Sequence, residues 1–275
     1  MTEEQPVAVS SSLAPDANLN RVALVSGGGT GIGRATAIAF GASGAKVAIC
    51  GRHMDSLAST AEAIESIGGT CLPVVTDVRE HEEVSQLVDT VLDCFGAVDV
   101  LVNNAGGQFT APAESITLKG WRAVHRLAVD AAWDMTQTVA ARSMIPRRTG
   151  LVVFIGFSPR RGIPGMVHAS AARAAVENLA SALAGEWGPY GIRSVCIAPG
   201  NIATSGLDQY GPDRVAEWAT EVPLGRLGTP EEVGEVIAFL STAAGAYISG
   251  TTVVIDGGLD AWRRPGPSAP AQVAP

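Results

Sequence analysis

The sequence predicts a single doubly wound α/β domain built on a seven-stranded parallel sheet. Three observations support this fold class. Seven short apolar runs alternate along the chain with longer segments of helical periodicity. The runs are continuously apolar, which is typical of strands that helices cover on both faces. The 275 residues are 47% hydrophobic and 17% charged, a composition that suits one large core.

Each expected strand is a short apolar run that stops at small or polar residues. The first run, RVALVSG, ends at Gly27, and the fourth, VDVLVNNAG, ends at Gly106. Glycine and asparagine commonly interrupt strands and begin turns. In chain order the strands are expected at residues 21–27, 45–51, 72–78, 98–106, 151–157, 192–200 and 251–258.

The segments between the strands have the features of helices. Leu57, Ala61 and Ile64 recur at helical spacing after the second strand, and residues 79–96 begin with acidic side chains that suit a helix dipole. Thr229 is a suitable N-cap, with proline following at the first helical position. Helices are expected at residues 31–43, 54–68, 79–96, 119–146 (ending at Pro146), 169–187 and from Thr229 onward, with a loop of about 28 residues after the sixth strand.

Composition and charge indicate where the folded domain begins and ends and exclude some classes of protein. Residues 1–19 lack periodicity and residues 261–275 carry four prolines, so we expect two disordered tails around a domain of residues 20–260. The net charge of −8 argues against a nucleic-acid partner. There is no long apolar run for a membrane span, no basic signal peptide and no C-x-x-C pair among the four cysteines, so we expect a cytoplasmic protein with reduced thiols.

The first strand runs directly into a glycine-rich segment, SGGGTGIGR. The spacing Gly27-x-x-x-Gly31-x-Gly33 places Thr30 and Ile32 at the start of the first helix. Glycine lets the backbone approach a pyrophosphate closely, and a helix start offers free N–H groups. A glycine-rich turn without a ligand is the alternative. The position after the first strand of a β/α series favours a nucleotide-binding loop.

The sequence lacks residues that a Walker A phosphate site and an H-E-x-x-H zinc site require. Arg34 and Ala35 follow the loop, where a Walker A site needs lysine and serine or threonine. His81 and Glu82 begin a helix, but the second histidine of a zinc-binding H-E-x-x-H motif is missing. We therefore expect no metal site.

The end of the second strand bears on the choice of dinucleotide. In dinucleotide-binding folds, a carboxylate at this position favours NAD, and an arginine accommodates the 2′-phosphate of NADP. The chain has Arg52 here, with Arg34 available nearby. NADP(H) is the expected cofactor, and a solvated turn residue is the alternative role for Arg52.

In combination, these motifs resemble those of the short-chain dehydrogenase/reductase family, whose members have a single Rossmann-type domain. The resemblance covers residues 20–258 and includes the glycine loop, Asp77-Val78, residues 103–106, residues 199–204 and residues 256–258. It implies three groups of cofactor contacts: Asp77 and Val78 to the adenine; Asn104, Ala105 and Gly106 to the adenine ribose; and Pro199, Gly200, Ile202 and Thr204 around the nicotinamide. It also implies a homo-oligomer, a tetramer or a dimer.

The chain departs from the four catalytic side chains of this family, which are asparagine, serine, tyrosine and lysine. Arg173 stands at the lysine position, and Ala169 stands at the tyrosine position four residues earlier. Gly156 replaces the serine and Ala128 replaces the asparagine. Arginine keeps its proton near neutral pH, so Arg173 is expected to hold ribose hydroxyls and supply positive charge rather than act as an acid.

Within the family, the sequence resembles the branch that includes peroxisomal trans-2-enoyl-CoA reductase and 2,4-dienoyl-CoA reductase. Members of this branch reduce C=C bonds conjugated to a thioester. The similarity lies in five segments: residues 103–109, 119–121, 168–174, 186–187 and 209–211. We therefore expect an NADPH-dependent reductase of an activated C=C bond that acts on a small molecule such as an acyl thioester. The alternatives are an atypical carbonyl or imine reductase and a catalytically silent NADP-binding protein.

Two side chains are candidates for the missing proton donor. His168 precedes the tyrosine position and could donate a proton or hydrogen-bond the thioester oxygen, although a helix-start histidine bonded to backbone is the alternative. Tyr210 lies in the long loop, which would cover the crevice as a lid. Weaker candidates are the hydroxyls of Ser158 and Ser170, and the pair Arg160-Arg161 for an anionic substrate group.

Overall fold

The computed structural model describes residues 11–160 and 162–261, and its fold class is the predicted one. All seven strands are parallel, in the order β3-β2-β1-β4-β5-β6-β7. They are β1 (Val22–Ser26), β2 (Lys46–Gly51), β3 (Thr70–Val75), β4 (Val100–Asn103), β5 (Gly150–Ile155), β6 (Ile192–Pro199) and β7 (Thr252–Ile255). The strand order reverses between β1 and β4, which places a ligand crevice at the carboxyl ends of these strands.

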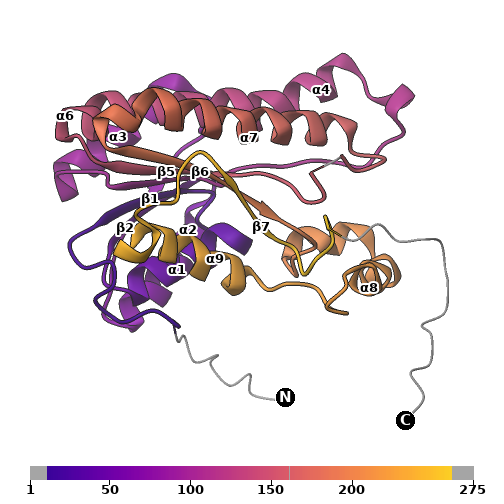
Figure 1. Ribbon diagram of the computed structural model, residues 1–275, viewed down its shortest axis with the longest axis horizontal. Helices are drawn as coiled ribbons and strands as arrows, with labels where there is room; N and C mark the ends of the chain where they lie inside the picture. Colours follow the sequence, from indigo (N-terminus) through magenta and orange to yellow (C-terminus); the bar gives the residue numbers. More distant parts are fainter. Residues whose placement is uncertain (1–10, 161, 262–275) are drawn as a thin grey trace, which may run out of the picture.

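Helices cover both faces of the sheet (Figure 1). One face carries α3 (His81–Phe95), α4 (Leu118–His125), α5 (Ala131–Val139), α6 (Ile145–Arg147) and α7 (Val167–Trp187). The other carries α1 (Gly31–Ala42), α2 (Met54–Ser66) and α9 (Pro230–Ser241), with α8 (Pro212–Glu221) beyond the end of β7. This three-layer arrangement explains why the strands are apolar throughout.

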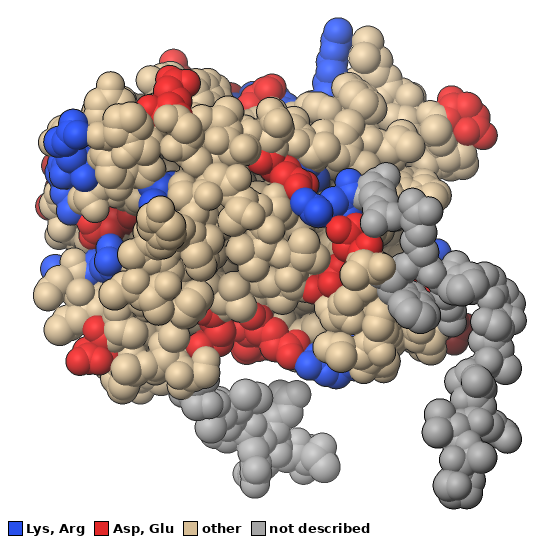
Figure 2. Space-filling view, viewed as in Figure 1, with Lys and Arg blue, Asp and Glu red and all other residues tan. Residues whose placement is uncertain are grey.

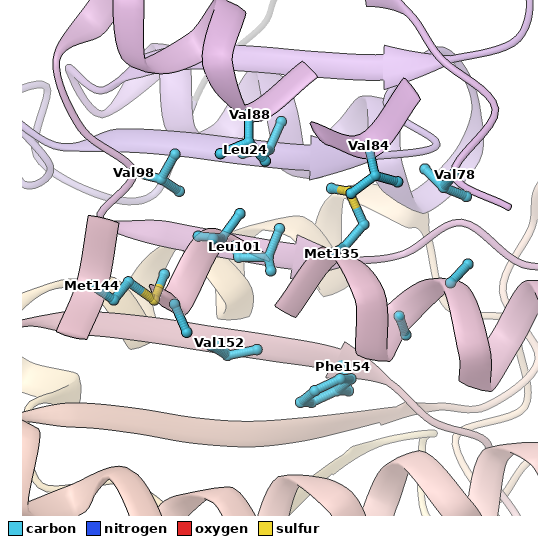
Figure 3. Close-up of a cluster of buried hydrophobic side chains, with 14 of the residues drawn as sticks. Leu24, Val78, Val84, Val88, Val98, Leu101, Met135, Met144, Val152 and Phe154 are labelled. Atoms are coloured by element: carbon cyan, nitrogen blue, oxygen red, sulfur yellow. The ribbon is translucent and has the colours of Figure 1, made fainter. Parts of the chain in front are cut away.

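Two apolar cores lie on opposite sides of the sheet. The core under α3, α5 and α7 contains Leu101, Met135 and Phe154, which Figure 3 shows between the sheet and its helices. The core under α1, α2 and α9 contains the fully buried Phe40 and Ile237. The two cores hold the strand ends in fixed positions, so the crevice between β1 and β4 is built on rigid elements.

The helix expected at residues 119–146 is one continuous helical segment, but it is less regular than its periodicity suggests. It contains two π-helical turns, at Arg126–Asp130 and Ala140–Met144. The expectation that it stops at Pro146 is wrong, because it continues to Arg147 and ends where Arg148 adopts a φ of 53°. Pro146 lies in the last turn, where its missing N–H removes only one hydrogen bond.

The segment after β6, expected as a loop of about 28 residues, contains regular secondary structure. It contains a 3-10 turn at Ser205–Tyr210 and the helix α8, whose first residue is Pro212. Proline at the first helical position after Gly211 is a helix-start signal that the sequence contains. The expected strands β3 and β4 are also shorter than predicted, because residues 76–78 and 104–106 leave the sheet to line the crevice.

The N-terminal tail expected at residues 1–19 is shorter in the structure. Residues 1–10 lie outside the described residues, as does the C-terminal segment 262–275. Asn18, in contrast, is fully buried and donates to the Ser43 hydroxyl and to the carbonyl oxygen of Ala238. The folded unit therefore begins before residue 20, because a buried asparagine joins it to α1 and α9.

The surface charges, the helices and the cysteines of the described residues have the following features. Among the described residues on the face shown in Figure 2, Lys and Arg side chains lie between acidic ones and form no continuous basic surface. No helix in residues 11–160 and 162–261 is long and apolar enough to cross a membrane. All four cysteines are free thiols, and Cys50 and Cys196 are buried.

The N-terminus of α9 provides a stability prediction. The Thr229 hydroxyl accepts from the Glu232 N–H at 3.3 Å, and the Glu232 carboxylate accepts from the Thr229 N–H at 2.8 Å, so the two form a capping box. Thr229→Ala should lower the free energy of unfolding by about 1 kcal/mol. Urea unfolding measures this change. Thr90→Ala, on the exposed face of α3, is the control and should have little effect.

Candidate active site

The glycine-rich segment forms a tight loop between β1 and α1. Gly27 and Gly31 have φ angles of +66° and +52°, which favour glycine. A Cβ on Gly33 would lie 2.2 Å from the carbonyl oxygen of Gly27, so only glycine lets the first turn of α1 pack against the loop. Thr30 is the N-cap of α1, and its side chain makes no capping hydrogen bond. The first N–H groups of α1 are thus directed to a ligand position at the crevice.

Asn104 and Ser26 join the ends of β1 and β4 beneath this loop. The Asn104 side-chain amide donates to the carbonyl oxygens of Ser26 at 2.9 Å and Gly27 at 3.3 Å. The Ser26 hydroxyl accepts from the N–H groups of Asn104 and Ala105, each at 3.0 Å. These bonds fix the phosphate loop relative to the strand that follows the crevice. Asn104 therefore shapes the site with its side chain as well as lining it.

A cavity of about 380 Å³ opens above the glycine loop at the carboxyl ends of the strands. It brings together most of the predicted cofactor residues from five separate segments: Gly27, Thr30, Gly31, Ile32, Arg52, Asp77, Val78, Asn104, Ala105, Gly106 and Thr204. The remaining predicted residues, Gly33, Arg173, Pro199, Gly200 and Ile202, do not line it. The cavity therefore extends along the strand ends from β3 to β4, the region expected for the adenosine and pyrophosphate parts of a dinucleotide.

Sequence reasoning missed several residues of this cavity. His53, Ser56, Arg79 and Leu127 also line it. His53 and Ser56 adjoin Arg52 at the start of α2, and Arg79 follows Asp77 by two residues, so proximity in sequence could have identified them. Leu127 gives no such signal, because it reaches the cavity only through the packing of the helical segment around residues 126–130.

Two charged side chains that line the cavity, Asp77 and Arg52, have different surroundings. Asp77 forms an ion pair with Arg79, and its Oδ1 lies 2.8 Å from the Arg79 Nε. This hydrogen bond, with a weaker contribution from Arg52, lowers the pKa of the Asp77 carboxyl to about 2. Asp77 is already paired, whereas Arg52 lines the cavity at the end of β2 without a carboxylate beside it in sequence. An anionic group is therefore favoured near Arg52.

The segment after β6 approaches the glycine loop from the other side. A Cβ on Gly31 would lie 3.3 Å from Cγ2 of Thr204, so the two segments are in contact. Gly200 packs against Asp256, where a Cβ would come within 2.6 Å of the Asp256 side chain. Ile202 is buried and forms an isolated bridge with Gly228. Gly200 and Ile202 thus position Thr204 at the cavity.

The position of the family serine is closed by packing. A Cβ on Gly156 would lie 2.7 Å from the Sγ of Cys196 in the neighbouring strand β6. Cys196 is fully buried, and this burial raises the pKa of its thiol to about 12, so it packs here as a neutral group. A serine at position 156 has no room while Cys196 is present.

The asparagine and tyrosine positions lie in one small apolar cluster. Ala128 and Ala169 are buried together with Val124, Met166 and Ala172, between the helical segment 118–147 and α7. Tyr210, from the segment after β6, packs against this cluster. Its hydroxyl is buried and has no hydrogen-bond partner among the described residues, and its ring contacts Trp218 edge-on at 4.9 Å. The Tyr210 phenol, from the segment after β6, thus adjoins the position where the family carries its tyrosine.

Arg173 connects the ends of two strands, β4 and β5, with its guanidinium. Its Nη1 donates to the carbonyl oxygen of Ile155 at 2.7 Å. Its Nη2 lies so close to Gly106 that a Cβ there would come within 2.2 Å of it. Burial lowers the pKa of the Arg173 guanidinium from its ordinary value, yet arginine retains its proton at neutral pH. Arg173 therefore supplies a fixed positive charge next to the residues that line the cavity.

His168 lies at the start of α7 and is completely buried. Neither ring nitrogen has a hydrogen-bond partner among the described residues, so the alternative of a histidine bonded to backbone is excluded within them. Its ring stacks on Phe109 with centroids 4.2 Å apart. Burial lowers the pKa of His168, and the nearby His125 contributes in the same direction. The imidazole is therefore neutral in the folded protein near pH 7.

The weaker candidates are engaged in structural contacts. The Ser158 hydroxyl donates to Asp256, and the Ser170 hydroxyl accepts from the Ile163 N–H at 3.0 Å. Arg160 pairs with Glu177 at 2.8 Å and with Asp260 at 3.2 Å, which join β5, α7 and the segment after β7. Arg161 lies outside the described residues. These contacts favour a structural role for Ser158, Ser170 and Arg160.

Known proteins match nearly the whole domain. A family model described as enoyl-(acyl carrier protein) reductase matches residues 27–260. A Bacillus subtilis (strain 168) protein named "Probable 2,4-dienoyl-CoA reductase [(2E)-enoyl-CoA-producing]" is 34% identical over 252 residues, covering 90% of this chain and 98% of that protein. A Synechocystis 3-oxoacyl-[acyl-carrier-protein] reductase is 37% identical over 243 residues, covering 87% and 96%.

Solved structures match equally well. A candidate NAD(P)-dependent gluconate 5-dehydrogenase from Beutenbergia cavernae, solved with NADP bound at low occupancy, is 33% identical with a TM-score of 0.84. The match covers 90% of this chain and 100% of that one.

The contact between Gly156 and Cys196 can be tested by a double-mutant cycle. Gly156→Ser should destabilise the protein by about 1–3 kcal/mol, because the new side chain overlaps the Cys196 thiol. Adding Cys196→Ala should recover much of this loss, as measured by urea unfolding of both single variants and the double variant. Gly185→Ser is the control, since nothing lies within 4 Å of a Cβ there. Additive effects of the two substitutions would contradict the direct contact.

Proposed function

Because this chain belongs to the short-chain dehydrogenase/reductase family, we propose that it is an NADPH-dependent reductase of a C=C bond conjugated to a thioester carbonyl. One observation carries this proposal: eleven of the predicted cofactor residues line one cavity, while the serine, asparagine and tyrosine positions are Gly156, Ala128 and Ala169. Carbonyl reduction in the family relies on those side chains. A conjugated C=C bond can instead accept a hydride on carbon, without immediate protonation of its carbonyl oxygen.

The residues of the cavity fit a dinucleotide phosphate. The space beside Gly27 and Gly31 is bounded by backbone that only glycine can form, and the N-terminus of α1 opens into it. Arg52 at the end of β2, with His53 and Ser56 beside it, suits a ribose 2′-phosphate. When bound, NADPH supplies a hydride to the substrate.

Arg173 and Tyr210 take separate roles in this proposal. Arg173 holds the ribose hydroxyls next to Gly106 and keeps a positive charge near the reacting carbons, as the family lysine does. Tyr210, whose hydroxyl lacks a partner among the described residues, donates a proton to the α-carbon when the lid segment closes over substrate. The π-helical turn at Arg126–Asp130, which includes Ala128, lies beneath these groups.

The relatives support both the leading function and its alternative. The Bacillus subtilis protein is named for dienoyl-CoA reduction, and the family model for enoyl reduction. The Synechocystis protein is a 3-oxoacyl reductase, so an atypical carbonyl or imine reductase is the second candidate, with a silent NADP-binding protein as the third. Exposed Trp121, Trp133 and Val167 on α4, α5 and α7 favour assembly as a homo-oligomer, a dimer or tetramer.

A substrate panel tests the reaction. NADPH oxidation should be faster with 2-enoyl-CoA or 2,4-dienoyl-CoA thioesters than with ketones or cyclic imines, because only the thioesters present a conjugated C=C bond. Turnover of ketones or imines alone would replace this proposal by the second candidate. Tight NADPH binding with no turnover at all would favour the silent protein.

The role of Arg52 gives a prediction about the cofactor. Arg52→Ala should weaken NADPH binding by about 10-fold or more and leave NADH binding nearly unchanged, because only NADPH carries the 2′-phosphate. Fluorescence titration of both cofactors measures the two Kd values. Arg122→Ala, exposed on α4 and outside the cavity lining, is the matched control. Equal losses of affinity for the two cofactors would contradict this role.

A further inference from the structure

The imidazole of His168 is a polar group whose hydrogen-bonding capacity the folded chain does not use. It is 0% exposed, and neither Nδ1 nor Nε2 contacts a donor or acceptor within the described part of the chain. Leaving a buried polar group without a partner costs about 1–3 kcal/mol, so such groups in folded proteins are rare and often functional. Stability alone would favour an apolar side chain at this position.

Phe109, which is partly exposed, covers one face of the His168 imidazole. Phe109 stacks on the imidazole with an interplanar angle of 31°, and it is itself 38% exposed. It fits against Gly120 of α4, where a Cβ would lie 2.9 Å from the Phe109 ring. Phe109 belongs to the segment that leaves the cavity after Gly106, which has no regular secondary structure up to residue 112. If the Phe109 ring moved away, the face of the imidazole that it covers would become accessible to a ligand.

The position of His168 along α7 places it on the substrate side of the cofactor. Arg173 follows five residues later, about 7.5 Å along the helix axis, and its guanidinium lies against Gly106 at the cavity. The adjacent Ala169 packs in the apolar cluster that Tyr210 covers. His168 thus lies beyond the end of the cofactor cavity and next to the position where the family carries its tyrosine.

We propose that His168 is a catalytic residue whose N–H hydrogen-bonds the carbonyl oxygen of the substrate once Phe109 has moved aside. The inference rests on the proposed function. As a hydride from NADPH bonds to the β-carbon, the electron pair of the C=C bond shifts toward that oxygen, and the α-carbon then takes a proton from Tyr210 or water. The hydrogen bond from His168 stabilises the negative charge on the oxygen between these two events. A neutral imidazole has the required N–H and remains uncharged throughout.

The missing hydrogen bonds of His168 make it possible to distinguish a catalytic role from a structural role by experiment. A histidine retained for packing or hydrogen bonding would lose stability when replaced by an apolar side chain of similar size. His168 has no such bonds to lose, so His168→Leu should keep or raise the melting temperature. It should also lower kcat by about 100-fold, the usual effect of removing one donor to a developing oxyanion, and leave the Kd for NADPH unchanged.

Two further variants make the test specific. His168→Gln keeps an N–H donor at a similar reach and should recover part of the lost kcat. His125→Leu makes the same replacement at a partly buried histidine of α4, whose Nδ1 contacts the Trp121 carbonyl oxygen at 3.0 Å, and should leave kcat within about twofold of the wild type. A wild-type kcat in His168→Leu would overturn the proposal, as would a large drop in its melting temperature with no rescue by glutamine.

An NMR measurement distinguishes failure of this inference from failure of the proposed function. The ring nitrogens of ¹⁵N-labelled His168 are observed in the complex with NADP⁺ before and after addition of a saturated acyl-CoA thioester. A shift at one nitrogen, absent with free CoA, is the expected result. If the wild type reduces no enoyl thioester but the shift occurs, the proposed reaction fails and the contact to His168 stands. If thioesters are reduced and no shift occurs, the role of His168 is disproved.

Discussion

The junction between Ser26 and Asn104 is the interaction on which the site depends. These residues end β1 and begin the segment after β4, the two strands between which the sheet changes direction. A parallel sheet leaves strand ends without hydrogen-bond partners at this point, and the Asn104 amide supplies them. The glycine loop, the N-terminus of α1 and the segment toward Phe109 all extend from this junction. One short polar network therefore holds the segments that line the cavity in place relative to one another.

The catalytic region shows how a site can lose side chains and remain well packed. Cys196 occupies the space of a serine beside Gly156, and Ala128 and Ala169 join an apolar cluster that Tyr210 covers. Arg173 retains the positive charge of the family lysine and anchors it to the Ile155 carbonyl oxygen. The polar side chains next to this cluster come from the segment after β6, which carries Tyr210, and from the start of α7, which carries His168. Two of the buried side chains that have unpartnered polar atoms among the described residues adjoin this cluster: Tyr210 packs against it, and His168 directly precedes Ala169 in α7.

Much of the fold and of the cofactor site could be predicted from local patterns. Continuous apolar runs and helical periodicity identified seven parallel strands, because burial on both faces constrains every residue of such a strand. Eleven of the predicted cofactor residues line one cavity, since glycines and strand-end motifs mark backbone that must approach a ligand. The π-helical turns, the helix α8 and the packing of Asn18 were not predicted. The buried position of Asn18 depends on hydrogen bonds to Ser43 and Ala238, which lie far from it in sequence.

The sequence by itself determined the sheet, the glycine loop, Arg52 and the absence of the family's four catalytic side chains, because each is a property of residue type at a fixed spacing. Tertiary structure alone decided the state of the remaining polar groups. It paired Arg160 with Glu177 and Asp260, bound Ser158 to Asp256, and buried His168 against Phe109 without a hydrogen bond to any described residue. Whether a side chain is free to act depends on which neighbours the fold brings to it, and no spacing along one chain encodes that outcome.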